Sequence, residues 1–261
     1  MKRALLIGIN YFDTESELGG CHNDVDAMQK LLVDTFHFDA QDIEIMKDVK
    51  GDKAHLEPDS PTRHNIMQRM KELVAKTKSG DTLYVHYSGH GTWGWDRNHD
   101  ERDQRDELIC PVDDAYINDD ELYSILVLPL PYGAKLRCIF DCCHSGTILD
   151  LPCQWRFGNY TYSRRVPKSV INLDCLMLSG CKDTQTSADA WIGSERNGDY
   201  AGAMTWAFES AVRELGEDRL RDMTWKDLIY RIRWLLKKGE YTQVPQLSCC
   251  RKSQLKEQIT M

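Results

Sequence analysis

The sequence predicts an α/β fold in which a mostly parallel central sheet carries helices on both faces. Short apolar runs of strand length alternate along the chain with amphipathic stretches of helical period. The apolar runs are nearly continuous, which is typical of strands that are buried on both sides of a parallel sheet. The length of 261 residues and the hydrophobic share of 41% allow a large domain with a sizeable core.

Each element is predicted from its own pattern of apolar and turn residues. The apolar runs predicted as strands are Arg3–Ile9, Asp42–Met46, Asp81–Ser88, Lys135–Phe140, Leu173–Ser179 and Val244–Cys249. The segments with apolar residues at helical spacing are Cys21–Phe36, Ser60–Lys76, Asp119–Leu128, Ala203–Leu215 and Thr224–Lys237. Between Trp93 and Glu107 the chain is polar, acid-rich and without periodicity, and a loop of this kind inside a compact domain is usually functional.

Two reactive side chains follow strands that are far apart in the sequence. His90 lies in Ser88-Gly89-His90-Gly91, and Cys143 lies in Asp141-Cys142-Cys143-His144-Ser145-Gly146. Parallel neighbours end at the same edge of a sheet, where ligand crevices form. A thiol and an imidazole placed together there make a nucleophile and its base.

The neighbours of this pair also have expected roles. The backbone N–H groups of Gly91 and Cys143 are candidates for holding an oxyanion. His144 follows Cys143 directly, so its side chain points elsewhere, and Cys142 is expected to pack inward. From residue types alone, an inert cysteine and a surface or capping histidine remain the alternative interpretation.

Charge and cysteine content restrict the partners. The net charge of −8 argues against nucleic acid and suits a cationic ligand or divalent metal ions. The 10 cysteines include no C-x-x-C pair, which argues against a structural zinc site. No signal peptide and no apolar stretch of membrane-spanning length is recognisable, so we expect a cytoplasmic protein with free thiols and no membrane contact.

The motifs together resemble those of metacaspases, which are caspase-related cysteine peptidases that cleave after a basic residue. The segments that carry the resemblance occur in the family's order over nearly the whole chain. They are Gly20–Asp24, His86–Gly91, Asp106–Asp113, Asp119–Glu121, Phe140–Gly146, Leu149–Pro152 and Leu178–Asp189. The resemblance implies a caspase-like (caspase-hemoglobinase) fold in one peptidase domain, residues 1–261. A large part, 1–153, would be followed by a short join, 154–168, and a small part, 169–261.

The resemblance also implies roles for individual residues. Cys143 would be the nucleophile and His90 the base, while Asp24, Ser88 and Asp141 would form an acidic pocket for the Arg or Lys side chain of a protein or peptide substrate. A pocket lined by carboxylates would reject an Asp side chain. The alternatives stay open here: Asp24 would suit a helix N-terminus, and Asp141 could order its turn.

A second acidic set is implied to bind calcium. The matching residues are Asp106, Asp119, Asp120 and Asp150. Calcium prefers hard oxygen ligands and tolerates irregular geometry. Acid runs are also common in solvated loops and at helix starts, and the stretch between Asp113 and Asp119 is shorter than in many relatives.

The join carries basic residues that match the expected specificity. Self-cleavage of a zymogen is therefore expected at Arg156, Arg164, Arg165 or Lys168. Members of the family are usually monomers. The alternative functions are a catalytically silent caspase-like interaction module, a calcium-independent Arg/Lys peptidase, and a metal-dependent hydrolase that uses the acid cluster.

Overall fold

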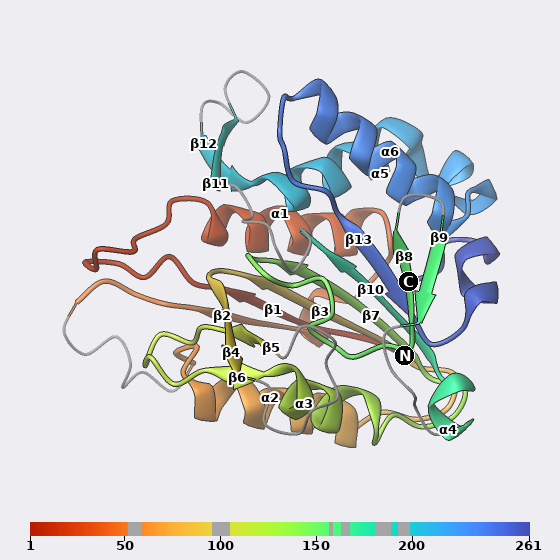
Figure 1. Cartoon of the computed structure of the whole chain (residues 1–261), viewed down its shortest axis with the longest axis horizontal. Helices are drawn as coiled ribbons and strands as arrows, with labels where there is room; N and C mark the ends of the chain where they lie inside the picture. The colour runs from red at the N-terminus through yellow and green to blue at the C-terminus, as the bar shows by residue number, and fades with distance from the viewer. Residues whose placement is uncertain (52–58, 96–104, 157–158, 163–167, 181–188, 193–198) are drawn as a thin grey trace.

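The computed structural model describes residues 1–51, 59–95, 105–156, 159–162, 168–180, 189–192 and 199–261 (Figure 1). Its central feature is an eight-stranded sheet. The strands of this sheet are β1 (Lys2–Gly8), β2 (Ile43–Lys47), β3 (Thr82–Ser88), β7 (Lys135–Asp141), β8 (Cys153–Arg156), β9 (Asn159–Tyr162), β10 (Asp174–Ser179) and β13 (Gln246–Cys249). Their order is β2-β1-β3-β7-β10-β13-β8-β9. The strands from β2 to β10 run parallel, and the pairs beyond β10 are antiparallel.

Helices cover both faces of this sheet (Figure 1). On one face lie α1 (Cys21–Asp34), α5 (Ala203–Asp222) and α6 (Trp225–Lys238), and on the other lie α2 (Arg63–Ala75) and α3 (Asp119–Leu122). Neighbouring residues of β1 alternate between the two layers, since Leu6 belongs to one apolar cluster and Leu5 and Ile7 to the other. The predicted fold class is therefore confirmed, and burial on both faces explains why the strands read as continuous apolar runs.

The segment predicted as an irregular loop contributes a small second sheet. It contains β4 (Gly91–Trp95), β5 (Arg105–Ile109) and β6 (Ile117–Asn118), paired antiparallel in that order. A separate two-stranded sheet pairs β11 (Asp189–Ile192) with β12 (Asp199–Gly202). Because β4 follows His90 directly, the first of these sheets fixes one side of the histidine turn.

Three predicted elements differ from the structure in instructive ways. The helix expected over Asp119–Leu128 is α3, started by an Asn118–Glu121 capping box, followed by the π-helical turn η3 (Tyr123–Val127). The helix expected to end at Leu215 does lose its helical backbone at Gly216, where φ is +68°. The described residues of the join include 154–156 of β8 and 159–162 of β9, which belong to the main sheet.

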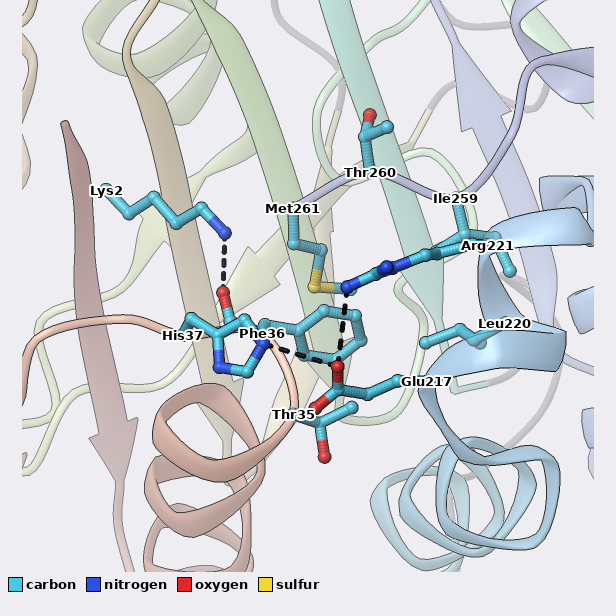
Figure 2. Close-up of a pocket in the computed structure, with 10 residues that line it drawn as sticks. All are labelled: Lys2, Thr35, Phe36, His37, Glu217, Leu220, Arg221, Ile259, Thr260 and Met261. Atoms are coloured by element: carbon cyan, nitrogen blue, oxygen red, sulfur yellow. Dashed lines mark hydrogen bonds and ion pairs between the residues drawn. The ribbon is translucent and has the colours of Figure 1, made fainter.

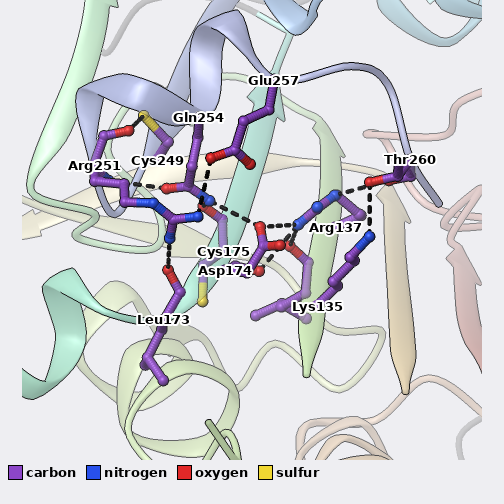
Figure 3. Close-up of polar contacts among 11 residues, drawn as sticks. Lys135, Arg137, Leu173, Asp174, Cys175, Cys249, Arg251, Gln254, Glu257 and Thr260 are labelled. Atoms are coloured by element: carbon purple, nitrogen blue, oxygen red, sulfur yellow. Dashed lines mark hydrogen bonds and ion pairs between the residues drawn. The ribbon is translucent and has the colours of Figure 1, made fainter. Parts of the chain in front are cut away.

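The amino ends of the strands form the edge opposite to the histidine and cysteine turns. There Arg137 of β7, 2% exposed, pairs with Asp174 of β10 at 2.9 Å and donates to the Thr260 carbonyl at 3.1 Å (Figure 3). A cavity of about 230 Å³ also opens at this end, lined by Lys2, Phe36 and Arg221 among others (Figure 2). It lies at the start of β1 and is therefore remote from the strand ends that carry His90 and Cys143. Across the described residues, no helix combines the length and the apolar character needed to cross a bilayer.

Candidate active site

The strand register brings the histidine and cysteine turns to neighbouring positions. β3 and β7 pair in parallel with Ser88 opposite Asp141, and His90 and Cys143 each follow two residues later. A Cβ placed on Gly91 would lie 2.1 Å from the Cys143 carbonyl oxygen, so only glycine permits this approach. Both His90 and Cys143 are partly exposed, whereas Cys142 is 1% exposed and packs inward as predicted.

Two residues of the segment after β1 hold the histidine. The backbone N–H of His90 donates to the Tyr11 hydroxyl at 2.8 Å, and the two rings lie 4.6 Å apart. Nε2 of His90 lies 2.7 Å from the Ser16 carbonyl oxygen. Because a carbonyl can only accept, Nε2 carries a hydrogen, and Nδ1 holds the lone pair in the neutral ring. Nδ1 is therefore the nitrogen that can take a proton from a thiol.

Sequence reasoning missed both Tyr11 and Ser16. Tyr11 lies three residues beyond the end of β1, whose neighbour is β3, so its place in the sequence could have pointed to it. Its positive φ of +53° could not be read from the sequence.

A second thiol near the site does not compete as a nucleophile. Burial, followed by the negative charge of Cys143 as a thiolate, raises the pKa of Cys110 to about 12. Cys110 therefore stays protonated at neutral pH.

The expected pocket residues converge next to this pair. Ser88 donates its hydroxyl to Oδ2 of Asp24 at 2.8 Å, and Asp141 ends β7. A Cβ placed on Gly202 would lie 2.3 Å from Oδ2 of Asp141 and 2.6 Å from Oδ2 of Asp24. Asp24, Ser88 and Asp141 are thus brought together, with the backbone of Gly202 lying against both carboxylates.

The start of α5 holds these carboxylates in place. The N–H of Gly202 donates to Asp24 at 3.0 and 2.9 Å, and the N–H of Thr205 donates to Oδ2 of Asp141 at 2.8 Å. The positive end of the helix dipole favours both negative charges. Asp24 and Asp141 are only 0% and 4% exposed, so both carboxylates are buried beneath the residues around β12. Gly202 and Thr205 were not predicted, although Gly202 precedes a predicted helix and is therefore a candidate N-cap.

The acidic residues assigned to calcium form a second buried group. Asp106, Asp119 and Asp150 are 7%, 2% and 2% exposed, and Asp120 is half-buried. Burial, followed by the negative charges of Asp150 and Asp106, raises the pKa of Asp119 to about 8. The N–H groups of Glu107 and Asp120 donate to Asp119 at 2.9 and 2.8 Å and oppose this rise.

The donor chemistry of this group fits calcium, because buried carboxylate oxygens at mutually repelling distances favour a divalent cation. The side chains are not yet arranged as a metal site. Within the part of the chain that the structure describes, no three or more His, Cys, Asp or Glu side chains are placed to hold a metal ion together. Calcium would therefore have to draw these side chains together.

The basic residues of the join are only partly described. Arg156 ends β8, and Lys168 begins α4 (Lys168–Ile171) with an exposed side chain. Arg164 and Arg165 lie outside the described residues.

Comparison with known proteins identifies the family. A family model for the metacaspase, peptidase C14 domain matches residues 2–152. The chain is 35% identical to Metacaspase-1 of Schizosaccharomyces pombe over 95% of this chain and 67% of that protein. It is 34% identical to Metacaspase-1 of Scheffersomyces stipitis over 100% of this chain and 73% of the relative, and 39% identical to Metacaspase-2 of Arabidopsis thaliana over 89% and 56%.

Solved structures support the fold alone. Protein GSU0716 from Geobacter sulfurreducens superposes with a TM-score of 0.64 at 19% identity, covering 99% of this chain and 97% of that one. Caspase-1 from Spodoptera frugiperda gives a TM-score of 0.51 at 15% identity, covering 95% and 85%. The family model and the sequence relatives confirm the expected family, and the chain belongs to the metacaspases, a family of cysteine-type endopeptidases.

Proposed function

We propose that this metacaspase cleaves peptide bonds after Arg or Lys, with Cys143 as nucleophile and His90 as its base. One observation supports the proposed specificity: the carboxylates of Asp24 and Asp141 both lie against Gly202. They are next to the strand ends that continue to His90 and Cys143. Two ionised carboxylates beside a nucleophile attract a guanidinium or ammonium group and repel an acidic side chain.

The proposed chemistry follows from the orientation of His90. Nδ1 takes the proton of the Cys143 thiol, and the sulfur attacks the scissile carbonyl carbon to form a tetrahedral intermediate. The N–H groups of Cys143 and Gly91 are the proposed donors to the oxyanion. The imidazolium then gives its proton to the leaving amine, and water releases the acyl group from Cys143. Ser16 keeps Nε2 protonated throughout, which holds the ring in one tautomer.

A matched set of fluorogenic peptides tests this specificity. The peptides differ only in carrying Arg, Lys or Asp before the cleaved bond. We expect cleavage of the Arg and Lys peptides by the unmodified protein and none by Cys143→Ala or His90→Ala. Asp141→Asn should lose the preference for basic peptides while Cys143 stays reactive toward a thiol-alkylating reagent. Preferential cleavage of the Asp peptide would contradict the proposed pocket, and activity of Cys143→Ala would contradict the nucleophile.

We further propose that calcium binds at Asp106, Asp119, Asp120 and Asp150 and stimulates the enzyme. Binding to the folded state alone raises its stability by mass action, so calcium should raise the thermal midpoint. Asp119→Asn should reduce this shift. Asp114→Asn is the matched control, because Asp114 is exposed with φ +56°, a conformation that asparagine tolerates. An equal shift in both variants would place the calcium elsewhere.

Self-processing in the join is the third part of the proposal. Lys168 supports it, since it is exposed and basic, and Arg156, Arg164 and Arg165 share the basic character that the pocket would select. Purified protein given calcium should yield fragments whose new N-termini map to the join, and Cys143→Ala should stay intact. A chain that remains whole while it cleaves the Arg peptide would eliminate self-processing without affecting the specificity.

The Cys143→Ala variant, chelation and thiol alkylation distinguish the proposed peptidase from two other functions. An interaction module without catalysis would keep its biological effect after Cys143→Ala. A metal-dependent hydrolase using the acid cluster would lose activity to chelation but not to thiol alkylation. The position of Cys143 beside His90 favours the peptidase over both.

A further inference from the structure

A pair of cysteines outside the active site lies on neighbouring strands. Cys153 of β8 and Cys249 of β13 are directly opposite each other in an antiparallel register. Directly opposed residues in such a pair have Cα atoms about 4.5 to 5.5 Å apart, which is within the range that a disulfide spans. The two sulfurs lie close enough to change each other's pKa. Each also contacts a backbone carbonyl oxygen, Cys153 Sγ that of Cys250 at 3.9 Å and Cys249 Sγ that of Arg251 at 3.3 Å. The backbone therefore already supplies the geometry of a disulfide.

The two thiols of this pair differ chemically. The Cys249 side chain, aided by the charge and N–H of Lys252 and opposed by burial, lowers the pKa of Cys153 to about 7. The Cys153 side chain, followed by burial, raises the pKa of Cys249. The two pKa shifts run in opposite directions, so Cys153 is the more readily ionised of the two thiols. Lys252 is exposed, whereas Cys153 itself is only 3% exposed.

A second cysteine pair serves as an internal comparison. The backbone N–H of Cys250, just beyond the end of β13, donates to the Cys175 carbonyl at 3.3 Å. The Cys250 side chain, followed by burial, raises the pKa of Cys175 well above its usual value, and Cys175 is 0% exposed. In this pair the Cys175 sulfur therefore stays a thiol.

We propose that Cys153 and Cys249 are an oxidative modification site at which a small peroxide forms a reversible disulfide between β8 and β13. The Cys153 thiolate attacks one peroxide oxygen and the O–O bond breaks. The hydroxide that leaves takes up the proton that Cys153 released on ionisation and becomes water. Cys153 is now a sulfenic acid, oxidised by two electrons. The Cys249 sulfur attacks it, the S–O bond breaks, and the second hydroxide leaves with the Cys249 proton. Two thiols and one peroxide give one disulfide and two waters.

The location of this bond gives it a consequence for the whole chain. Cys153 is the last residue of the large part, and β13 belongs to the small part, so the disulfide spans the join. A chain cut anywhere in the join would stay covalently connected until a thiol reductant acts. Closing so long a loop also constrains the unfolded state, and we expect the thermal midpoint to rise by about 10 °C on oxidation.

Peptide mapping of the full-length protein tests the proposal. In a Cys143→Ala background, which removes the active-site thiol, the protein is treated with hydrogen peroxide, alkylated and digested with trypsin. We expect a dithiothreitol-sensitive link between peptides 138–156 and 239–251, which contain Cys153 and Cys249. Formation of the link should follow a titration midpoint near pH 7.

Three serine variants assign the sulfurs. Cys153→Ser should abolish the link, although Cys138 and Cys142 remain in the same peptide. Cys249→Ser should abolish the link, whereas Cys250→Ser, its neighbour in the same peptide, should retain it. A link between peptides 239–251 and 169–182, which contains Cys175 and Cys181, in place of the expected link would overturn the proposal. Peptides 138–156 and 239–251 recovered fully alkylated from peroxide-treated, folded protein would overturn it as well, independently of any proteolytic activity.

Discussion

Replacing Gly202 with alanine tests how closely the fold holds the two pocket carboxylates. The added Cβ would lie 2.3 Å from Oδ2 of Asp141 and 2.6 Å from Oδ2 of Asp24, although nonbonded carbon and oxygen atoms stay more than about 3 Å apart. One or both carboxylates must move, or β12 must shift away and lengthen the Gly202 N–H bonds to Asp24, now 3.0 and 2.9 Å.

The magnitude follows from the bonds that are disturbed. A hydrogen bond to a charged group contributes about 1.5 to 3 kcal/mol. If the carboxylates bind the substrate cation, loss of one such contact lowers kcat/KM for an Arg peptide roughly 10- to 150-fold. The assay is kcat/KM on the Arg peptide, together with the thermal midpoint, which shows whether the variant is folded.

Gly94→Ala is the matched control. Its added Cβ would meet only the flexible Leu108 side chain, at 3.3 Å from Cδ1, and should leave kcat/KM nearly unchanged. A folded Gly202→Ala protein with the activity of the unmodified chain would refute the assignment of Asp24 and Asp141 to substrate binding. If Gly202→Ala does not fold, kcat/KM of Asp24→Asn on the Arg peptide tests the assignment instead, because this change removes the charge without adding a heavy atom.

Three further predictions concern buried polar groups. Arg137→Met leaves Asp174 without its cation in a largely buried place, and we expect a loss of about 3 to 5 kcal/mol in urea unfolding; a loss below 1 kcal/mol would contradict this. Burial lowers the pKa of His86 from 6.5 to about 3, so the folded protein excludes a proton that the unfolded chain binds near pH 6.5. Stability should therefore fall by several kcal/mol as the pH drops from about 6.5 to 3, and His86→Gln should remove that component when the two unfolding profiles are subtracted; parallel profiles would refute the reasoning. Tyr11→Phe removes the acceptor of the His90 N–H and should cost about 1 to 3 kcal/mol of stability and lower kcat, whereas an unchanged kcat would show that this contact does not position the ring.

The sequence was sufficient for the elements that carry strong local patterns. The buried strands ending at Ser88 and Asp141 were predicted within a residue, and their parallel pairing is what sets His90 beside Cys143. Asp24, Ser88 and Asp141 required the family resemblance, because their meeting depends on the packing of α1 against the sheet.

The structural features that the sequence did not predict depend on contacts between residues far apart in the chain. β4 reads Gly-Thr-Trp-Gly-Trp, and its two glycines weaken the strand signal, so only its pairing with β5 reveals it. The near-complete burial of the pocket carboxylates depends on where β12 and the start of α5 dock, which no local pattern encodes. In the same way, the hydrogen bond from His90 to Ser16 joins residues 74 positions apart.

The place of the join within the main sheet has a consequence for any proteolytic maturation. β7 belongs to the large part and β10 to the small part, and they pair through consecutive rungs from Lys135–Asp174 to Phe140–Ser179, while β8 pairs with β13. Scission between residues 154 and 168 breaks one peptide bond but no rung of either ladder. The nicked molecule should accordingly elute from a sizing column as a single particle and separate only under denaturing conditions, so maturation would create new chain ends in the join rather than release a subunit.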